Sequence, residues 1–369
     1  MKVNYRQLSV MVFLSFVALK FFALPGVMYT HAENMSWVVT LSLVLIDGLY
    51  TLWILSLMKK NQSKNFLEFL TDIMGPVFAR ILLIILLVKY ALLAGHIVKG
   101  LDLFVVENLY AKLDWYIYIL PLMGLIGFMI YKGIRNIGRV SELIVWPIAI
   151  GCIYIGFKGL SGVEWMEFLP FFKDGFAPLL KCSYSYISWF GSSVFLFALF
   201  GYVDFETEKK STIFKYLFLA LFVIMLLHIV FYGLFGRVSP THGYCISDVG
   251  QYSAERSSVD ELSWLVVSLW IVAQVVQLAL FCFCMSKCIQ FIFNAKMSIW
   301  SDLSVVGFLF AWSLTGERIV KLEKIYFSNF LSILTIVTQY ILPIILWIGF
   351  SINEKQKRRK NEKTNKNTF

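Results

Sequence analysis

The sequence predicts an all-α polytopic membrane protein with about ten transmembrane helices. Hydrophobic residues make up 59% of the 369 residues and charged residues only 15%, whereas a soluble domain carries about 25% charged residues. Apolar stretches of about 20 residues, the length needed to cross a bilayer, recur along the chain. We therefore expect a single transmembrane domain over residues 1–353, followed by a basic cytoplasmic tail over 354–369.

Each predicted span is an apolar stretch with polar or turn-forming residues at its ends. The ten spans in order are 8–30, 37–58, 77–100, 114–131, 140–160, 176–201, 212–236, 263–293, 299–315 and 328–351. The third and eighth are unusually long, so we expect them to tilt or to extend beyond the bilayer. The ninth is polar at its start. The first span is too long for the apolar region of a signal peptide and contains a lysine, so we expect it to remain in the mature protein.

The basic residues give the orientation. With the N-terminus inside, 21 of the 33 basic residues fall on the cytoplasmic side and nine outside, while Lys20, Lys89 and Lys181 lie within spans. Cytoplasmic segments are enriched in Lys and Arg, so both termini are expected to be cytoplasmic. The net charge of +10 then follows from topology and does not indicate a nucleic-acid partner.

Polar residues inside the spans are the candidate functional residues. Lys20 lies near the middle of span one, five residues before Pro25-Gly26, which we expect to break the helix. A charge at that depth costs at least about 2.5 kcal/mol and is kept mainly where it pairs or lines a path. Asp47 in span two should reach similar depth, which allows an ion pair with Lys20. Lys89 in span three is placed at a similar depth.

Two further charged residues lie nearer the span ends. Glu142 starts span five, where we expect Arg139 as its partner, and Lys181 near the outer end of span six is expected to reach the interface.

A second break is predicted at Phe190-Gly191-Ser192-Ser193, within span six. Transporters with inverted repeats interrupt corresponding helices in each half, and their substrate lies between the breaks. Spans one and six would open two five-span repeats of opposite sense, over about 8–160 and 176–351.

Neither catalysis nor a cofactor is predicted. The chain has no nucleotide-binding loop, zinc-protease motif or nucleophile elbow. Cys282, Cys284 and Cys288 lie in an apolar stretch without His or carboxylate partners, so we expect packing residues and no metal site.

These features resemble the spore germination permease family, the B-subunit type of germinant receptors in the amino acid–polyamine–organocation superfamily. The resemblance rests on Gln7-Leu8, the segment Ala18–Pro25, Gly138-Arg139 with Glu142 and Pro147, Phe190-Gly191, and Ser258–Leu262 followed by Trp264 and Trp270. It implies a LeuT-type five-plus-five fold in which spans one and six are mobile and spans three and eight support them. It also implies recognition of a small ligand, usually an amino acid, beside A-type and C-type subunits in the inner membrane of the spore.

The sequence departs from the family at both breaks. Relatives commonly carry G-x-G-I-L-x-L-P in span one, where Ala18 and Lys20 replace the glycines here, and many carry glutamate where Ser192 stands. The expected ligand-binding residues are Lys20, Ala18, Phe21, Pro25, Trp189, Phe190, Gly191, Ser192 and Ser193, with Gln274 and Gln277 facing the core. Possible ion-pair or coupling residues are Asp47, Lys89 and Glu142.

Three roles for Lys20 stay open: contact with a ligand carboxylate, replacement of a coupling cation, or structural pairing with Asp47. The expected function is a germinant-receptor B-type subunit. The alternatives are a proton-coupled amino acid permease and a structural membrane subunit whose pocket is vestigial.

Overall fold

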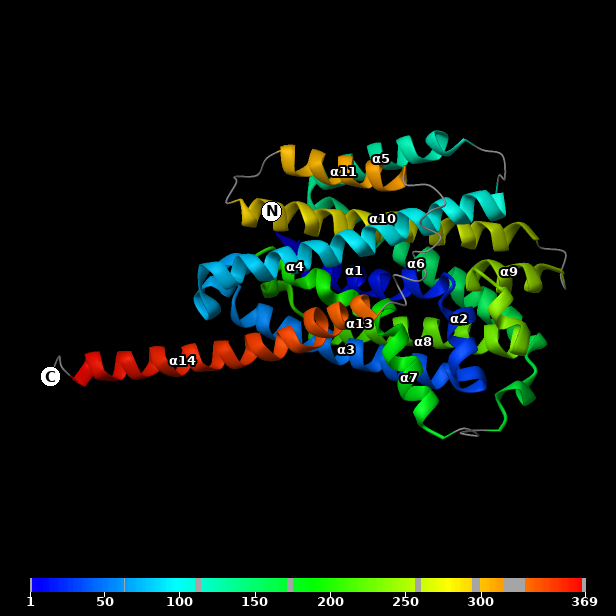
Figure 1. Cartoon of the computed structure of the whole chain (residues 1–369), viewed down its shortest axis with the longest axis horizontal. Coiled ribbons are helices and arrows are strands. Elements are labelled where there is room, and N and C mark those ends of the chain that lie inside the picture. The colour runs from blue at the N-terminus through cyan, green and yellow to red at the C-terminus, as the bar shows by residue number, and fades with distance from the viewer. Residues whose placement is uncertain are drawn as a thin grey trace.

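The computed structural model describes residues 2–62, 64–109, 114–170, 175–255, 260–293, 299–314 and 329–366. Within these residues the chain forms a helical bundle whose long helices run approximately along the long axis of Figure 1. The described strands are β1 (Val3–Asn4) and β2 (Val203–Asp204), which pair in parallel.

The described residues of the first half of the chain form six α-helices and short 3-10 or π segments. They are α1 (Tyr5–Val17), η1 (Ala18–Phe21), α2 (Leu24–Ala32), η2 (Glu33–Met35), α3 (Ser36–Lys60), α4 (Phe66–Phe104), η3 (Val105–Leu109), α5 (Trp115–Lys132), α6 (Ile134–Gly159), η4 (Leu160–Gly162) and η5 (Trp165–Phe168). Helix α4 kinks at Gly75, whose φ of +82° is accessible to glycine, and Pro76 follows. Span three was predicted to begin immediately after this kink.

The second half begins with the other interrupted helix. Its elements are α7 (Ala177–Tyr186), η6 (Ile187–Trp189), η7 (Ser192–Leu199), η8 (Phe205–Thr207), α8 (Lys210–Phe235), η9 (Gly236–Thr241), α9 (Cys245–Glu255), α10 (Asp260–Ile292), α11 (Ile299–Ser313), α13 (Asn329–Thr335), the π segment η11 (Ile336–Ile341) and α14 (Leu342–Lys366). Helix α14 extends out of the bundle toward the C-terminus, whereas α5 and α11 lie together along one edge of it (Figure 1).

Six described helical stretches are long and apolar enough to cross a membrane. They are Leu24–Lys60, Phe66–Asn108, Ile134–Gly162, Ser211–Thr241, Trp264–Ile292 and Asn329–Asn353. Tyr116–Lys132 and Ile299–Ser313 are shorter apolar helices. Predicted spans one and six are each divided into shorter helices by a break, so neither one as a whole is among these six stretches. The all-α membrane architecture is confirmed, and ten crossings with an inverted repeat stay a prediction.

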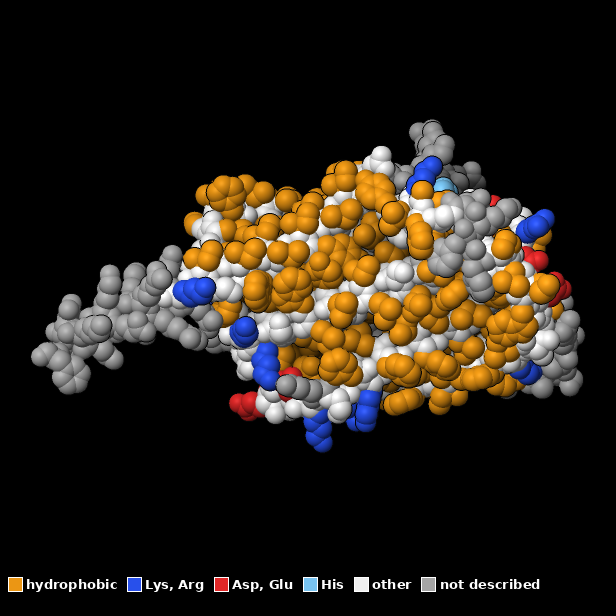
Figure 2. All heavy atoms as spheres, turned by 90° about the horizontal axis from the view of Figure 1, so that it is seen from below, with side chains coloured by type: hydrophobic (Ala, Val, Ile, Leu, Met, Phe, Trp, Pro, Cys, Tyr) orange, Lys and Arg blue, Asp and Glu red, His pale blue; other side chains and the backbone are white. Residues whose placement is uncertain are grey.

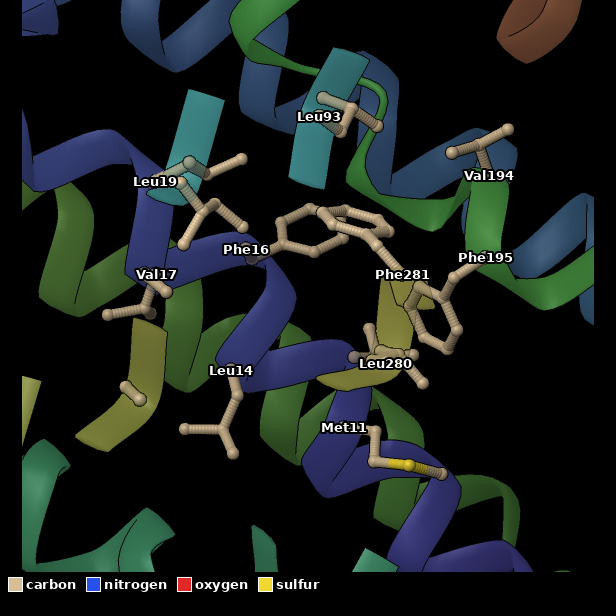
Figure 3. Packing of buried hydrophobic residues seen from close by; sticks show 14 of the residues in the cluster. Met11, Leu14, Phe16, Val17, Leu19, Leu93, Val194, Phe195, Leu280 and Phe281 are labelled. Carbon is tan, nitrogen blue, oxygen red and sulfur yellow. The ribbon is translucent and has the colours of Figure 1, made fainter. Parts of the chain in front are cut away.

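The outer surface and the interior are both apolar, as a bilayer requires. Figure 2 shows hydrophobic side chains across the middle of one face, with its charged side chains mostly toward the two ends. Inside, one hydrophobic core joins the helices. Figure 3 shows part of this core, where Phe16 of α1, Leu93 of α4, Val194 and Phe195 of η7, and Phe281 of α10 gather around the two interrupted helices.

Candidate ligand-binding site

The first helix of the bundle is interrupted just before Pro25. Helix α1 ends at Val17, η1 covers Ala18–Phe21, Phe22 is extended, and α2 begins at Leu24. Our expectation of a break at Pro25-Gly26 was therefore wrong in position. Pro25 lies in the first turn of α2, where a helix needs no N–H donor and the fixed φ of proline suits the helix.

The second interruption is at the predicted residues. Segment η6 ends at Trp189, Phe190 is extended, and Gly191 adopts a left-handed conformation with φ +81° and ψ +27°. A Cβ at Gly191 would also lie 3.0 Å from the methyl group of Thr335. Both the backbone angle and the close contact with α13 favour glycine here.

Lys20 connects the two interruptions. Its side chain is fully buried, and its ammonium group donates a hydrogen bond to the Ser192 hydroxyl at 2.8 Å. The same ammonium lies 5.4 Å from the ring centroid of Phe16 and 5.0 Å from that of Phe190. Aromatic faces attract cations, more strongly where water is excluded. Span one thus places a cation against the break in span six.

Asp47 of α3 occupies the other side of that break. Its Oδ2 accepts hydrogen bonds from the backbone N–H groups of Gly191 at 3.1 Å and Ser192 at 3.3 Å. Its Oδ1 accepts from the Ser193 hydroxyl at 2.9 Å and from Gln339 Nε2 at 3.0 Å. Gly191, Ser192 and Ser193 are expected ligand-binding residues, and in this structure their donors bond the carboxylate of Asp47.

Lys20 and Asp47 are close without forming a direct ion pair. Among the described residues, no carboxylate lies within 4.0 Å of the Lys20 ammonium. Ser192 joins the two residues, since its hydroxyl accepts from Lys20 and its N–H donates to Asp47. The predicted direct pair is therefore replaced by a connection through Ser192.

Lys89 reaches the same centre from α4. Its buried ammonium donates to the hydroxyl of Thr335, whose methyl group faces Gly191. Thr335 ends α13 and Gln339 lies in the following π segment, so span ten contacts both Lys89 and Asp47. π segments occur frequently at functional sites.

The backbone carbonyl groups freed by the first break are bonded by other helices. Trp270 Nε1 donates to the Ala18 carbonyl at 3.0 Å, and the Gln274 amide donates to the same oxygen. Gln277 donates to the Ser15 carbonyl at 3.2 Å. These bonds confirm that both glutamines face the core. An unpaired backbone group in a membrane costs several kcal/mol, so α10 stabilises the interrupted form of span one.

His228 of α8 contacts the backbone of Lys20. Its Nε2 donates to the Lys20 carbonyl at 3.1 Å, and its Nδ1 lies 3.1 Å from the Thr40 hydroxyl. Phe21 meets the His228 ring edge-to-face.

The remaining predicted residues lie at varying positions around this centre. Trp189 is buried edge-to-face against His96, on the side of Phe22. Glu142 lies apart from the centre, where it accepts from Gln7 at 3.0 Å and pairs with Arg6 at 3.4 Å. Our expectation of Arg139 as its partner was wrong, because the start of α1 lies closer. Lys181 is exposed, as expected.

Sequence reasoning missed Gln339, Thr335 and His228 as site residues. Gln339 and Thr335 are polar positions in an otherwise apolar span, which is the signal that singled out Lys20 and Asp47. The long sequence separation between these spans concealed their convergence.

A partly open cavity of about 100 Å³ lies elsewhere, between α5, α10 and α11. Its lining includes Lys287, Gln290 and Asp302. Gln290 donates to Ser286 and Ser301, and Ser286 donates to Asp302. This cavity is separate from the centre at the two breaks.

Fold and site together define a multi-pass helical membrane protein with two interrupted helices meeting at a buried charged centre. Residues 2–320 match the family model described as spore germination protein, and the chain belongs to the spore germination permease family. It is similar to the "Putative spore germination protein YfkT" of Bacillus subtilis (strain 168), with 26% identity over 212 residues. That alignment covers 55% of this chain and 56% of the relative, so the chain spans little more than half of the relative's length.

Proposed function

We propose that this protein is a germinant-receptor B-type subunit that recognises a small, amino-acid-like ligand between spans one and six. The observation that carries the proposal is the contact of Lys20 with Ser192, which joins the interrupted part of one helix to that of the other. Membership of the spore germination permease family supports the biological setting. A-type and C-type subunits would be its partners, and the spore inner membrane its location, with both termini cytoplasmic.

The mechanism would be a shift between two arrangements of the interrupted helices. In the arrangement described, Lys20, Asp47, Ser192 and Ser193 are buried and bonded to one another. A ligand that binds Lys20 must replace its bond to Ser192, and this changes how span one meets span six. Binding one arrangement more tightly than the other then changes their populations. The ligand needs no net movement across the membrane.

The first test is the substitution Lys20→Ala in the full chain. We expect it to abolish the ligand response, measured as the change in melting temperature of the purified protein with a panel of amino acids. Membrane insertion should persist, because the substitution removes a buried charge. The matched control is Lys181→Ala, which removes an exposed lysine from span six and should respond like wild type.

Other outcomes identify the alternative functions. A wild-type response in Lys20→Ala would contradict the ligand role. Failure of that variant to insert, together with a wild-type protein that ignores every amino acid, would favour a structural subunit in which Asp47 and Lys20 fill their own site. Net uptake of labelled amino acid by proteoliposomes that hold this chain alone would favour a proton-coupled permease.

A further inference from the structure

The buried centre holds more ammonium groups than carboxylates, and this imbalance indicates the charge of the ligand that it would bind. Two lysines, Lys20 and Lys89, are fully buried at this centre, and Asp47 is the one carboxylate buried with them among the described residues. Asp47 attracts both ammonium groups electrostatically. In the part of the chain that the structure describes, neither ammonium has a carboxylate within 4.0 Å. Their hydrogen-bond acceptors are the neutral hydroxyl groups of Ser192 and Thr335.

Both ammonium groups approach the break in span six. Lys20 bonds Ser192 directly, and Lys89 bonds Thr335, which packs against Gly191. Gly191 and Ser192 are adjacent in the chain. Lys20 therefore bonds the interrupted segment itself, and Lys89 bonds a residue of α13 that packs against this segment. An anionic group that enters at the break would approach both ammonium groups.

Asp47 is poorly placed to bind a cationic group of the ligand. Four donors hold it: two backbone N–H groups, the Ser193 hydroxyl and the Gln339 amide. Moving its carboxylate would leave those donors unpaired in a buried site, and a buried donor without an acceptor is costly. The amide oxygens of Gln274, Gln277 and Gln339 have no hydrogen-bond partner among the described residues. These oxygens are neutral, so they could accept a hydrogen bond but would not compensate a further positive charge.

We propose that the site recognises its ligand by the carboxylate, through Lys20 and Lys89 together, and that the ligand's ammonium group is dispensable. The ligand class is then small monocarboxylates, of which amino acids are one kind. This inference rests on the proposed function. A carboxylate brings the centre to formal neutrality, whereas an amine adds a third cation to it. Uncompensated charge in a membrane interior is costly. The carboxylate should therefore account for most of the difference in affinity between ligands that bind and ligands that do not.

The test compares ligands that differ only in their charged ends. Each of three side chains, methyl, isobutyl and benzyl, is presented as the amino acid, as its amide, and as the 2-hydroxy acid. Affinities are measured with the purified full chain in lipid nanodiscs. Among the ligands that bind, we expect the amide to bind at least about tenfold more weakly than the amino acid, as loss of a charge-assisted hydrogen bond predicts. The 2-hydroxy acid should stay within about tenfold of the amino acid.

The variant Lys89→Met tests whether Lys89 binds the ligand carboxylate. Lys89→Met keeps the length of the side chain and removes its charge, and it should weaken both carboxylate ligands by about tenfold or more. Lys181→Met is the control and should leave all affinities unchanged. If Lys89→Met fails to fold, the ligand series on wild-type protein still decides.

Each outcome has a separate meaning. An amide that binds as tightly as its amino acid overturns the inference and leaves the proposed function standing, as does a 2-hydroxy acid that fails to bind. Unchanged affinity in a folded Lys89→Met overturns the role of Lys89. Absence of binding by every ligand overturns the proposed function and the inference with it.

Discussion

At the scale of single residues, Asp47 organises the centre. Its carboxylate accepts four hydrogen bonds from two elements and balances part of the charge of Lys20 and Lys89. A buried carboxylate is stable only where donors and cations surround it. Asp47 therefore binds the interrupted segment of span six to α3 and to span ten.

We expect Asp47→Asn to destabilise the protein strongly. The amide would set its own N–H groups against donors and leave two buried ammonium groups without a counter-charge. Breaking a direct buried ion pair typically costs about 3–5 kcal/mol; Asp47 contacts the lysines through Ser192 and Thr335, so this range is an upper guide to the loss. The measurement is thermal unfolding of the purified variant in detergent. Asp72→Asn is the control, because the pair of Asp72 with Lys64 lies at the surface and is partly exposed, and surface pairs contribute about 0–1 kcal/mol. Equal melting temperatures for Asp47→Asn and wild type would contradict this role.

At the scale of elements, the two breaks have different causes. In span six, Gly191 adopts a left-handed backbone conformation that other residues adopt only at a cost. Because glycine has no side chain, α13 can also pack closely against it. In span one no glycine marks the break. The interruption at Ala18–Ala23 is instead held by donors from α8 and α10 that reach its free carbonyl groups.

This difference explains which break was predictable from sequence. Phe190-Gly191 carries a local signal and was found at its true position. The first break depends on Trp270, Gln274 and His228, which are more than 200 residues away, so local patterns pointed to Pro25 instead. Lys20, Asp47 and Lys89 were found because charge in an apolar span is conspicuous. Their arrangement through Ser192 and Thr335 depends on tertiary packing that a single sequence does not reveal.

The substitution Gly191→Ala tests the second break. The left-handed conformation costs a non-glycine residue about 1–2 kcal/mol, and the new Cβ would lie 3.0 Å from Thr335. We expect a lower melting temperature and weaker ligand binding. Gly124→Ala in α5 is the matched control, since nothing lies within 4 Å of a Cβ there, and it should be neutral or slightly stabilising. A Gly191→Ala protein with wild-type stability and affinity would show that the break is not needed.

At the scale of the whole molecule, contacts near both ends of span one bear on how it could move. At one end, β1 pairs with β2, which follows span six, and Arg6 and Gln7 contact Glu142. At the other end, a Cβ on Gly26 would lie 2.7 Å from the backbone oxygens of Ser239 and His242, so α2 packs directly on η9 and the residue after it. Span one is thus held near both ends, and the buried polar centre lies between them. We expect a ligand that binds at the centre to weaken the contacts at one end of span one more than those at the other end.

Hydrogen exchange tests the central claim most directly, because it reports where the ligand acts. The purified protein in nanodiscs is exchanged with and without an amino acid that raises its melting temperature, and Lys20→Ala is treated identically. We predict that the ligand slows exchange in the segments 18–23 and 187–193 of wild type, leaves α5 unchanged, and has no effect in Lys20→Ala. Protection that leaves both segments unchanged, or that persists in Lys20→Ala, would contradict a ligand site at the meeting of the two interrupted helices.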